Sequence, residues 1–439
     1  MKNLNYVYIE TYGCSANQNN SEILAGMLRS AGYQLTNNEK IAEIIILNTC
    51  VVKSKTENKI KRRIQDLAKE SKRKLIIVTG CMPETDAKQI KQLNEKAILL
   101  GTHHYKDIIN LIKKHKDNKL DLISQNVFLE NKNEEKLNLP KIPNNNLISI
   151  TQISEGCLGN CSYCKTKLAK GQLFSYDSDK IINSIEADLQ SGAKEIWLTS
   201  QDVANYGLDK GNKTPKLPEL LNKILALKHN FRLRLGMSDP NNVLPILNEL
   251  IEIYKNKKMY KFLHIPIQSA SNKILKDMNR FYNIKDINLI ITQFRKQIPD
   301  ITIATDIIVG YPTETEKDHQ ENINFIKTHK PDVLNISKMS IHKNTPAEKL
   351  KPLSINTINK RTTELMDLHK QTALENKQKF LNKTLGVFVN KKLQGDLYKT
   401  RDENYNIVLI SSKDKSILGK NINVKIKQAG VHHLIAERI

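Results

Sequence analysis

The sequence predicts an α/β protein built from an N-terminal doubly wound parallel sheet, a central partial (β/α)6 barrel and a small C-terminal all-β barrel. Three observations support this prediction. Short apolar strands alternate with amphipathic helices in two series, as parallel sheets require. A polar stretch over residues 131–146 separates the two series. After residue 382 the sequence pattern changes to short strands joined by turns that contain Gly, Asp or Asn, which is typical of small β-barrels.

The first series occupies residues 1–117. Its predicted strands read YVYIET, EIIILN, LIIVT and AILLG, and the helical stretches between them include SEILAGMLRS and ENKIKRRIQDLAKE. This βαβ alternation favours a parallel, doubly wound sheet. Residues 118–146 are predicted to be a linker or connection, because NKNEEKLNLPKIPNNN carries prolines and many polar residues without periodicity.

The second series occupies residues 147–382 and contains six β/α units. Its strands read LISITQIS, EIWLTSQ, RLRLGMS, FLHIPIQ, TIATDIIVG and VLNISKMSI. Six units suggest an open barrel, although periodicity alone does not separate it from a flat sheet. In either form, ligands bind at the carboxyl ends of the strands. A long helical pattern, INKRTTELMDLHKQTALENKQKFL, leads into the terminal β-barrel over residues 383–439.

The charge of the chain is strongly basic. Its 439 residues include 69 Lys and Arg against 46 Asp and Glu, a formal net charge of +23. Nucleic acid and anionic membranes are therefore the first partners to consider, and a merely solvated basic surface is the alternative. The terminal barrel carries eleven Lys and Arg and five Asp and Glu, which suits an RNA-binding appendage.

Nothing in the sequence indicates a membrane or a secretory route. The segment MKNLNYVYIETYGC lacks the apolar core of a signal peptide, and apolar runs such as IIIL fall far short of the roughly 18 residues that a membrane span requires. A cytoplasmic protein with reduced thiols is expected. Its six cysteines are too few for a disulfide scaffold.

Three cysteines follow the first three strands. Cys14, Cys50 and Cys81 end the stretches YVYIETYGC, EIIILNTC and LIIVTGC. The carboxyl ends of parallel strands lie at one edge of the sheet, so these thiols are predicted to converge there. The alternative is that each is a small buried hydrophobic residue.

The other three cysteines form the compact motif EGCLGNCSYCK, in which Cys157, Cys161 and Cys164 are spaced Cys-x3-Cys-x2-Cys. Three thiolates on such a loop can hold a 4Fe-4S cluster and leave one iron without a protein ligand. A structural zinc site would need a fourth Cys or His nearby, and the loop has none.

These motifs resemble those of the radical S-adenosylmethionine methylthiotransferases. GCLGNCSYCK is similar to the cluster signature of the superfamily, and the contexts TYGC, NTC and GC are similar to the upstream domain of the methylthiotransferase branch. The resemblance continues through HIPIQSAS, LKDMNRFY and DIIVGYPTET to a barrel like the TRAM module. In one departure, HKNTPAEK has Asn344 where the family tends to have glycine.

The resemblance implies two 4Fe-4S clusters. The catalytic cluster on Cys157, Cys161 and Cys164 would bind S-adenosyl-L-methionine and cleave it reductively to a radical. The auxiliary cluster on the other three cysteines would hold or donate the sulfur, and a second S-adenosyl-L-methionine would supply the methyl group. An electron donor such as flavodoxin or ferredoxin is implied as well, whereas the sulfur donor is not indicated.

The segment KTKLAKGQLFSY resembles the archaeal and eukaryotic branch of the family. That branch implies methylthiolation of threonylcarbamoyladenosine next to the anticodon, on its 3′ side, with the anticodon stem-loop of tRNA as partner. The alternatives are another tRNA adenosine, a ribosomal protein, or a non-catalytic iron–sulfur protein that binds RNA. An open iron on each triplet favours an enzyme, because a structural cluster gains from a fourth protein ligand.

Polar residues at the predicted strand ends are candidates for binding S-adenosyl-L-methionine, because such positions face the cleft of a barrel. A hydrogen-bonded cap at the strand end is the alternative for each of them. Tyr163, between two cysteines of the compact motif, could contact the adenine. The strand-end candidates are Gln201, Asp202, Ser238, Gln268 and Asp306.

Overall fold

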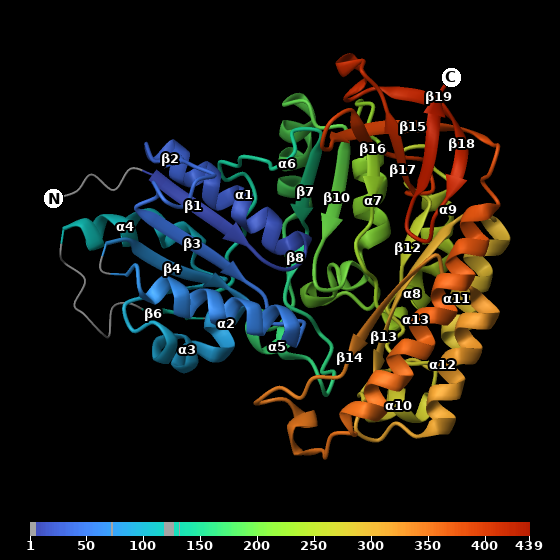
Figure 1. Ribbon diagram of the computed structural model, residues 1–439, viewed down its shortest axis with the longest axis horizontal. Helices are drawn as coiled ribbons and strands as arrows, with labels where there is room; N and C mark the ends of the chain where they lie inside the picture. The colour runs from blue at the N-terminus through green and yellow to red at the C-terminus, as the bar shows by residue number, and fades with distance from the viewer. Residues whose placement is uncertain (1–5, 72, 118–126, 131) are drawn as a thin grey trace.

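The computed structural model describes residues 6–71, 73–117, 127–130 and 132–439. Residues 118–126 and 131 of the predicted linker lie outside this description. Figure 1 shows a sheet domain beside an open barrel, with a small closed barrel against one end of the latter. The predicted fold class is therefore confirmed. Of the helices that the structure describes, none combines the length and apolarity needed to cross a membrane.

The N-terminal domain is a six-stranded parallel sheet with the order β2-β1-β3-β4-β5-β6. Every residue of β3 and β4 is buried, because apolar clusters under α2 and α3 cover one face and clusters under α1 and α4 cover the other. The elements are β1 (Tyr6–Thr11), α1 (Ser15–Ser30), β2 (Gln34–Leu35), β3 (Ile44–Thr49), α2 (Ser54–Ala68), β4 (Leu75–Gly80), α3 (Cys81–Leu93), β5 (Ile98–Gly101), α4 (Ile108–Lys116) and β6 (Val127–Phe128).

The central domain is a barrel of six parallel strands that follow one another in sequence order. The sets β7-β10-β11 and β12-β13-β14 are joined by the bridges Leu233↔Met259 and Met237↔His264. Within the described residues no pairing links β14 back to β7, so the barrel is open. The strands are β7 (Ile148–Gln152), β10 (Glu195–Thr199), β11 (Arg232–Arg234), β12 (Phe262–His264), β13 (Thr302–Val309) and β14 (Val333–Lys338).

Helices cover the outside of this barrel and form its largest apolar cluster with the strands. Short elements follow the strand ends. The helices are α5 (Lys165–Lys170), α6 (Ser178–Gln190), α7 (Leu217–Leu225), α8 (Pro240–Val243), α9 (Leu247–Tyr254), α10 (Asn272–Asp277), α11 (Ile284–Gln297), α12 (Glu316–His329) and α13 (Ile355–Gln378), and the remaining strands are β8 (Ser154–Glu155) and β9 (Phe174–Ser175).

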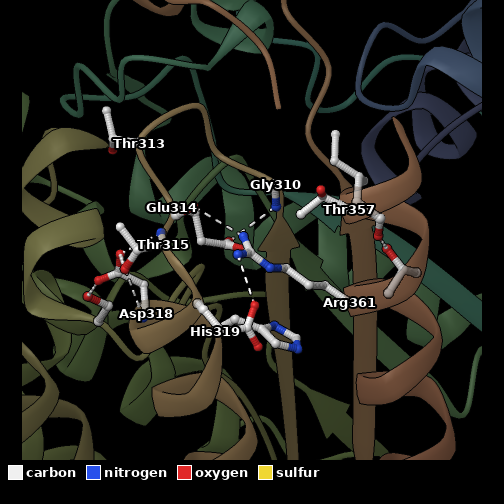
Figure 2. A network of polar contacts seen from close by, with 12 residues as sticks. Gly310, Thr313, Glu314, Thr315, Asp318, His319, Thr357 and Arg361 are labelled. Carbon is white, nitrogen blue, oxygen red and sulfur yellow. Dashed lines mark hydrogen bonds and ion pairs between the residues drawn. The ribbon is translucent and has the colours of Figure 1, made fainter. Parts of the chain in front are cut away.

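A buried ion pair ties α13 to the turn after β13. Arg361 on α13 donates from Nη1 to Glu314 Oε1 at 2.7 Å, and the backbone N–H of Gly310 donates to the other oxygen of the same carboxylate at 3.1 Å. Figure 2 shows these groups together with the start of α12, where Thr315 and Asp318 form a capping box. The first turns of the long helix are therefore tied to the carboxyl end of β13.

The C-terminal domain is a closed barrel with the order β15-β16-β17-β19-β18. Its turn between β16 and β17 inserts Tyr405 against Tyr260 and Phe262 of the central barrel, with ring centroids 4.9 and 4.8 Å apart. Sequence analysis did not predict the strand LYKTR. The strands are β15 (Thr384–Lys392), β16 (Leu397–Arg401), β17 (Ile407–Ser411), β18 (Asn421–Ala429) and β19 (Leu434–Arg438).

The N-terminal domain packs against the open edge of the central barrel. Helix α1 lies beside β7, and Asn19 Nδ2 donates to the carbonyl of Ile150 at 2.6 Å. Part of the predicted linker also packs here, because Lys136 is 3% exposed and its Nζ lies 2.5 Å from Glu155 Oε1. The two β/α domains are thereby joined by buried polar contacts.

Candidate functional site

The structure places Cys14, Cys50 and Cys81 at the carboxyl ends of β1, β3 and β4, which are neighbours in the sheet. Cys14 is exposed, whereas Cys50 and Cys81 are buried in the apolar cluster under α2 and α3. The loops approach closely, since a Cβ built on Gly13 would lie only 2.9 Å from Cys50 Sγ.

Two glycines permit this approach. Gly13 and Gly80 adopt φ angles of +108° and +88°, a region that side chains other than hydrogen rarely tolerate. A Cβ on Gly80 would lie 2.5 Å from the carbonyl oxygen of Thr49. The glycine before Cys14 and the glycine before Cys81 therefore let the three thiol-bearing loops share one edge.

Side-chain amides hold these loops in place. Asn17 Nδ2 donates to the carbonyls of Tyr12 and Thr49, each at 2.8 Å, and Asn48 Nδ2 donates to the carbonyl of Asn17 at 2.8 Å. The hydroxyl of Thr49 accepts from the N–H of Met82 at 3.1 Å. Every cysteine of the triplet is thus next to, or within three residues of, a loop position fixed by a hydrogen bond.

Burial raises the pKa of the Cys81 thiol to about 12, and the charge of Lys170 opposes this shift. Burial also raises the pKa of Cys50. Iron would offset this cost, because coordination deprotonates a thiol outright. In the part of the chain that the structure describes, no three His, Cys, Asp or Glu side chains form a group that could hold a metal ion. The irons of a 4Fe-4S cluster are bound by Cys thiolates, so three cysteines at neighbouring strand ends supply the ligand type that such a cluster uses.

The second triplet lies on the loop between β8 and α5. The N–H of Gly159 donates to Cys157 Sγ at 3.2 Å, and Arg280 Nη1 donates to Cys161 Sγ at 2.8 Å. Cys164 is the N-cap residue of α5. Hydrogen bonds to the sulfurs are a normal part of iron–sulfur sites and influence their reduction potential, so the loop is equipped for a cluster.

Helix α5 connects the two cysteine sites. It starts directly after Cys164, and its Ala169 packs in the apolar cluster that contains Cys50 and Cys81. Lys165 Nζ lies 2.6 Å from Asp86 Oδ2 in the N-terminal domain. Because six helical residues rise about 9 Å, one short helix spans the separation between the second triplet and the apolar cluster beneath the first.

Asp202 caps the N-terminus of the short 3-10 helix Val203–Asn205, which follows β10. Its Oδ1 accepts from the N–H groups of Ala204 and Asp239 at 2.9 and 3.0 Å, and its Oδ2 accepts from Asn242 Nδ2 at 2.7 Å. Burial raises the pKa of this carboxyl to about 6. The role predicted for Asp202 in binding S-adenosyl-L-methionine stays a prediction, with most of its hydrogen-bonding capacity already engaged.

Other predicted strand-end residues leave polar atoms free. Gln201 Oε1 and Ser238 Oγ are buried and have no hydrogen-bond partner among the described residues, as is also true of Gln152 Oε1 and Ser200 Oγ. All four lie at or just beyond the carboxyl ends of β7, β10 and β11. Buried polar atoms without partners indicate room for a polar ligand, so this edge fits S-adenosyl-L-methionine.

The remaining predicted residues are Asp306 on β13, Gln268 beyond the end of β12, and Tyr163 on the loop between β8 and α5. Gln268 has a φ of +63°, and its N–H donates to the carbonyl of Asp306 at 2.8 Å. The carboxylate of Asp306 is 2.6 Å from His264 Nε2. Tyr163 is half-buried and packs against an apolar cluster that includes Met278 and Tyr311.

Sequence reasoning did not assign roles to Arg280, Lys165 or Lys170. Arg280 lies in LKDMNRFY, and the sequence offers no spacing rule that brings it to Cys161 from more than a hundred residues away. Both lysines sit in a short helix and are buried through contacts with distant acidic groups. Asn344, which departs from the family pattern, has a φ of +63°, the conformation that a glycine would readily supply.

Comparison with known proteins matches both β/α domains. Residues 6–101 match the uncharacterized protein family UPF0004, and residues 151–326 match the radical SAM superfamily. Among solved structures, the radical S-adenosylmethionine methyltransferase TsrM from Kitasatospora setae is similar with a TM-score of 0.58 and 12% identity, over 78% of this chain and 74% of that one. At this identity the likeness concerns the fold.

Closer relatives align over almost the whole chain. A probable threonylcarbamoyladenosine tRNA methylthiotransferase from Archaeoglobus fulgidus is 37% identical over 434 residues, covering 98% of both chains. The threonylcarbamoyladenosine tRNA methylthiotransferase of Homo sapiens is 33% identical over 435 residues, covering 98% of this chain and 73% of the human protein.

Proposed function

Because the chain belongs to the family of threonylcarbamoyladenosine tRNA methylthiotransferases, we propose that it acts on the same nucleoside. It converts threonylcarbamoyladenosine, next to the anticodon on its 3′ side, to the 2-methylthio derivative. The chain is a radical S-adenosylmethionine enzyme with a second, N-terminal cysteine domain. Two 4Fe-4S clusters and S-adenosyl-L-methionine are the cofactors of this family.

The observation that carries the proposal is the position of the two cysteine triplets on either side of α5. Cys164 begins this helix, and Ala169 near its end packs with Cys50 and Cys81. Methylthiolation needs a radical source and a sulfur source close to one substrate carbon. The main contribution of the protein is to hold these groups at the right distance and orientation. A non-catalytic RNA-binding protein would not require this proximity.

The residues have separate tasks in this proposal. Cys157, Cys161 and Cys164 bind the catalytic cluster, with the N–H of Gly159 and the guanidinium of Arg280 donating to their sulfurs. When bound, the clusters and S-adenosyl-L-methionine supply the radical, the sulfur and the methyl group. S-adenosyl-L-methionine is bound by Tyr163 of the cluster loop and by the strand-end residues Gln201, Asp202, Ser238, Gln268 and Asp306.

The partners follow from the chemistry. The anticodon stem-loop of tRNA is the substrate, and the net charge of +23 favours binding of a polyanion. Reductive cleavage of S-adenosyl-L-methionine needs a low-potential electron donor, for which a flavodoxin or a ferredoxin is suitable. We place the reaction in the cytoplasm, where thiols are kept reduced.

Mass spectrometry of tRNA nucleosides tests the proposal. A strain that lacks the gene is compared with its parent and with a strain that expresses the wild-type chain again. We expect loss of 2-methylthio-threonylcarbamoyladenosine, accumulation of the unthiolated precursor, and restoration on re-expression. An unchanged nucleoside profile would refute the proposal and turn attention to a ribosomal protein; loss of a different methylthio nucleoside would point to another tRNA adenosine.

A further inference from the structure

A groove of about 610 Å³ opens on the N-terminal domain between the end of β1 and the outer face of α2. Tyr12 contributes from the strand, and Lys55, Lys59 and Arg62 contribute from the helix. These cations are spaced i, i+4 and i+7, so they share one helix face, and all three are exposed. The groove therefore combines a row of cations with an aromatic ring.

The charges of this row are not neutralised. The acidic side chains of the groove have partners of their own: Glu10 pairs with Arg63 at 2.8 Å, and Asp66 lies 3.3 Å from Lys69. Lys59 Nζ lies over the ring of Tyr12, 5.4 Å from its centroid. Lys55 and Arg62 pair with no acidic group in the described parts of the chain, so the groove has positive charge available for a ligand.

The groove is formed by residues that lie close in sequence to the auxiliary cysteines. Tyr12 is two residues before Cys14, which is exposed, and α2 begins four residues after Cys50. When the reacting base of an RNA substrate reaches this cysteine site, the nucleotides next to that base must lie on the surrounding protein surface. The groove is one of the surfaces that border that site.

We propose that this groove binds the phosphate backbone of the tRNA substrate beside the nucleotide that is modified. This inference rests on the proposed function, because it assumes that tRNA is the substrate. RNA loops are bound through cations that follow the phosphates and through aromatic side chains, the combination present here. An acidic protein that delivers electrons would also be attracted to cations. The ring of Tyr12 and the short distance in sequence to the auxiliary cysteines favour RNA as the ligand of the groove.

The experiment compares two double variants of the full-length protein carrying both clusters, each of which loses two positive charges. Lys55→Gln with Arg62→Gln removes the free cations of the groove. The matched control, Lys113→Gln with Lys114→Gln, removes two exposed cations from α4, on the opposite face of the same sheet. Fluorescence anisotropy measures the Kd for tRNA lacking the methylthio group, at several salt concentrations.

We expect the groove variant to bind roughly 10-fold more weakly at moderate salt, while the control stays within about twofold of wild type. The slope of log K against log salt should fall by about 1.4 in the groove variant, since each lost phosphate contact on a single strand contributes about 0.7. Cleavage of S-adenosyl-L-methionine without tRNA should be unchanged in both variants, because neither pair touches the cysteine loops.

Equal affinity and equal salt slope in the two double variants would overturn the inference. So would normal tRNA binding by the groove variant together with slower cluster reduction by flavodoxin, because the groove would then serve the electron donor. If the wild type itself bound no tRNA, the proposed function would fail first, and the inference with it.

Discussion

At the scale of single residues, the two cysteine triplets have different surroundings, and we assign them different roles in the reaction. Cys161 receives a hydrogen bond from Arg280, whereas Cys50 is buried among apolar side chains of the other domain. The first belongs to the loop that follows a barrel strand, and the second to the carboxyl end of a sheet strand. Changes at the two cysteines should therefore disable different halves of the reaction.

Replacing Cys161 with Ala should abolish reductive cleavage of S-adenosyl-L-methionine, because the catalytic cluster loses a ligand. Replacing Cys50 with Ala should leave cleavage, uncoupled from product, and abolish thiolation. Chromatography of 5′-deoxyadenosine and mass spectrometry of the tRNA nucleoside measure the two outcomes in one reaction mixture. Intact thiolation by the Cys50→Ala protein would contradict the assignment of separate clusters.

At the scale of elements, α13 depends on a buried charge. The Arg361 and Glu314 side chains are 7% and 0% exposed, and Arg361 also lies 3.2 Å from Glu316 (Figure 2). Burial raises the pKa of Glu314, and the arginine opposes that shift. A buried pair of this kind does little for net stability, but breaking it leaves an uncompensated charge.

Arg361→Met should lower the free energy of unfolding by about 3 to 5 kcal/mol at neutral pH, because Glu314 is then buried without its partner. The loss should shrink as the pH falls. A carboxyl whose folded pKa is raised binds its proton more tightly in the folded state, so acid stabilises that state and rising pH removes the gain. Urea unfolding at several pH values measures the effect.

The matched control is Arg361→Met combined with Glu314→Gln, which removes both charges and keeps an acceptor for the N–H of Gly310. It should recover most of the lost stability and show no pH dependence from this site. A double variant as unstable as the single one would mean that packing of Arg361, rather than its charge, holds the helix.

At the scale of the whole molecule, both outer domains complete the central barrel. The N-terminal domain lies along its open edge, and the terminal barrel places Tyr405 against aromatic residues of the strands. Tyr405 has a φ of +66° and is 8% exposed, so its place in the turn is imposed by packing. Removing residues 383–439 would uncover apolar surface, which confounds any test of RNA binding by deletion.

Surface charge offers a cleaner test of the terminal barrel. Lys391 and Lys420 are exposed and lie on adjacent segments, since the N–H of Val389 donates to the carbonyl of Lys420 at 3.0 Å. Changing both to Gln should weaken tRNA binding several-fold and reduce its salt dependence, with the melting temperature unchanged. The test is the affinity for tRNA measured at several salt concentrations. An unaltered slope of log K against log salt would show that this face of the barrel is not part of the RNA-binding surface.

The sequence by itself determined the local features: the β/α alternation, the cysteines at strand ends, the compact cluster motif and the basic terminal barrel. These features follow from hydrophobic periodicity and short-range spacing, which can be read from the sequence without knowing the tertiary contacts. Only the tertiary structure decided that α5 bridges the cysteine sites, that Arg280 reaches Cys161, and that Tyr405 packs against Phe262 of the central barrel. Such contacts join residues far apart in the chain, and no local pattern encodes which distant partners the packing brings together.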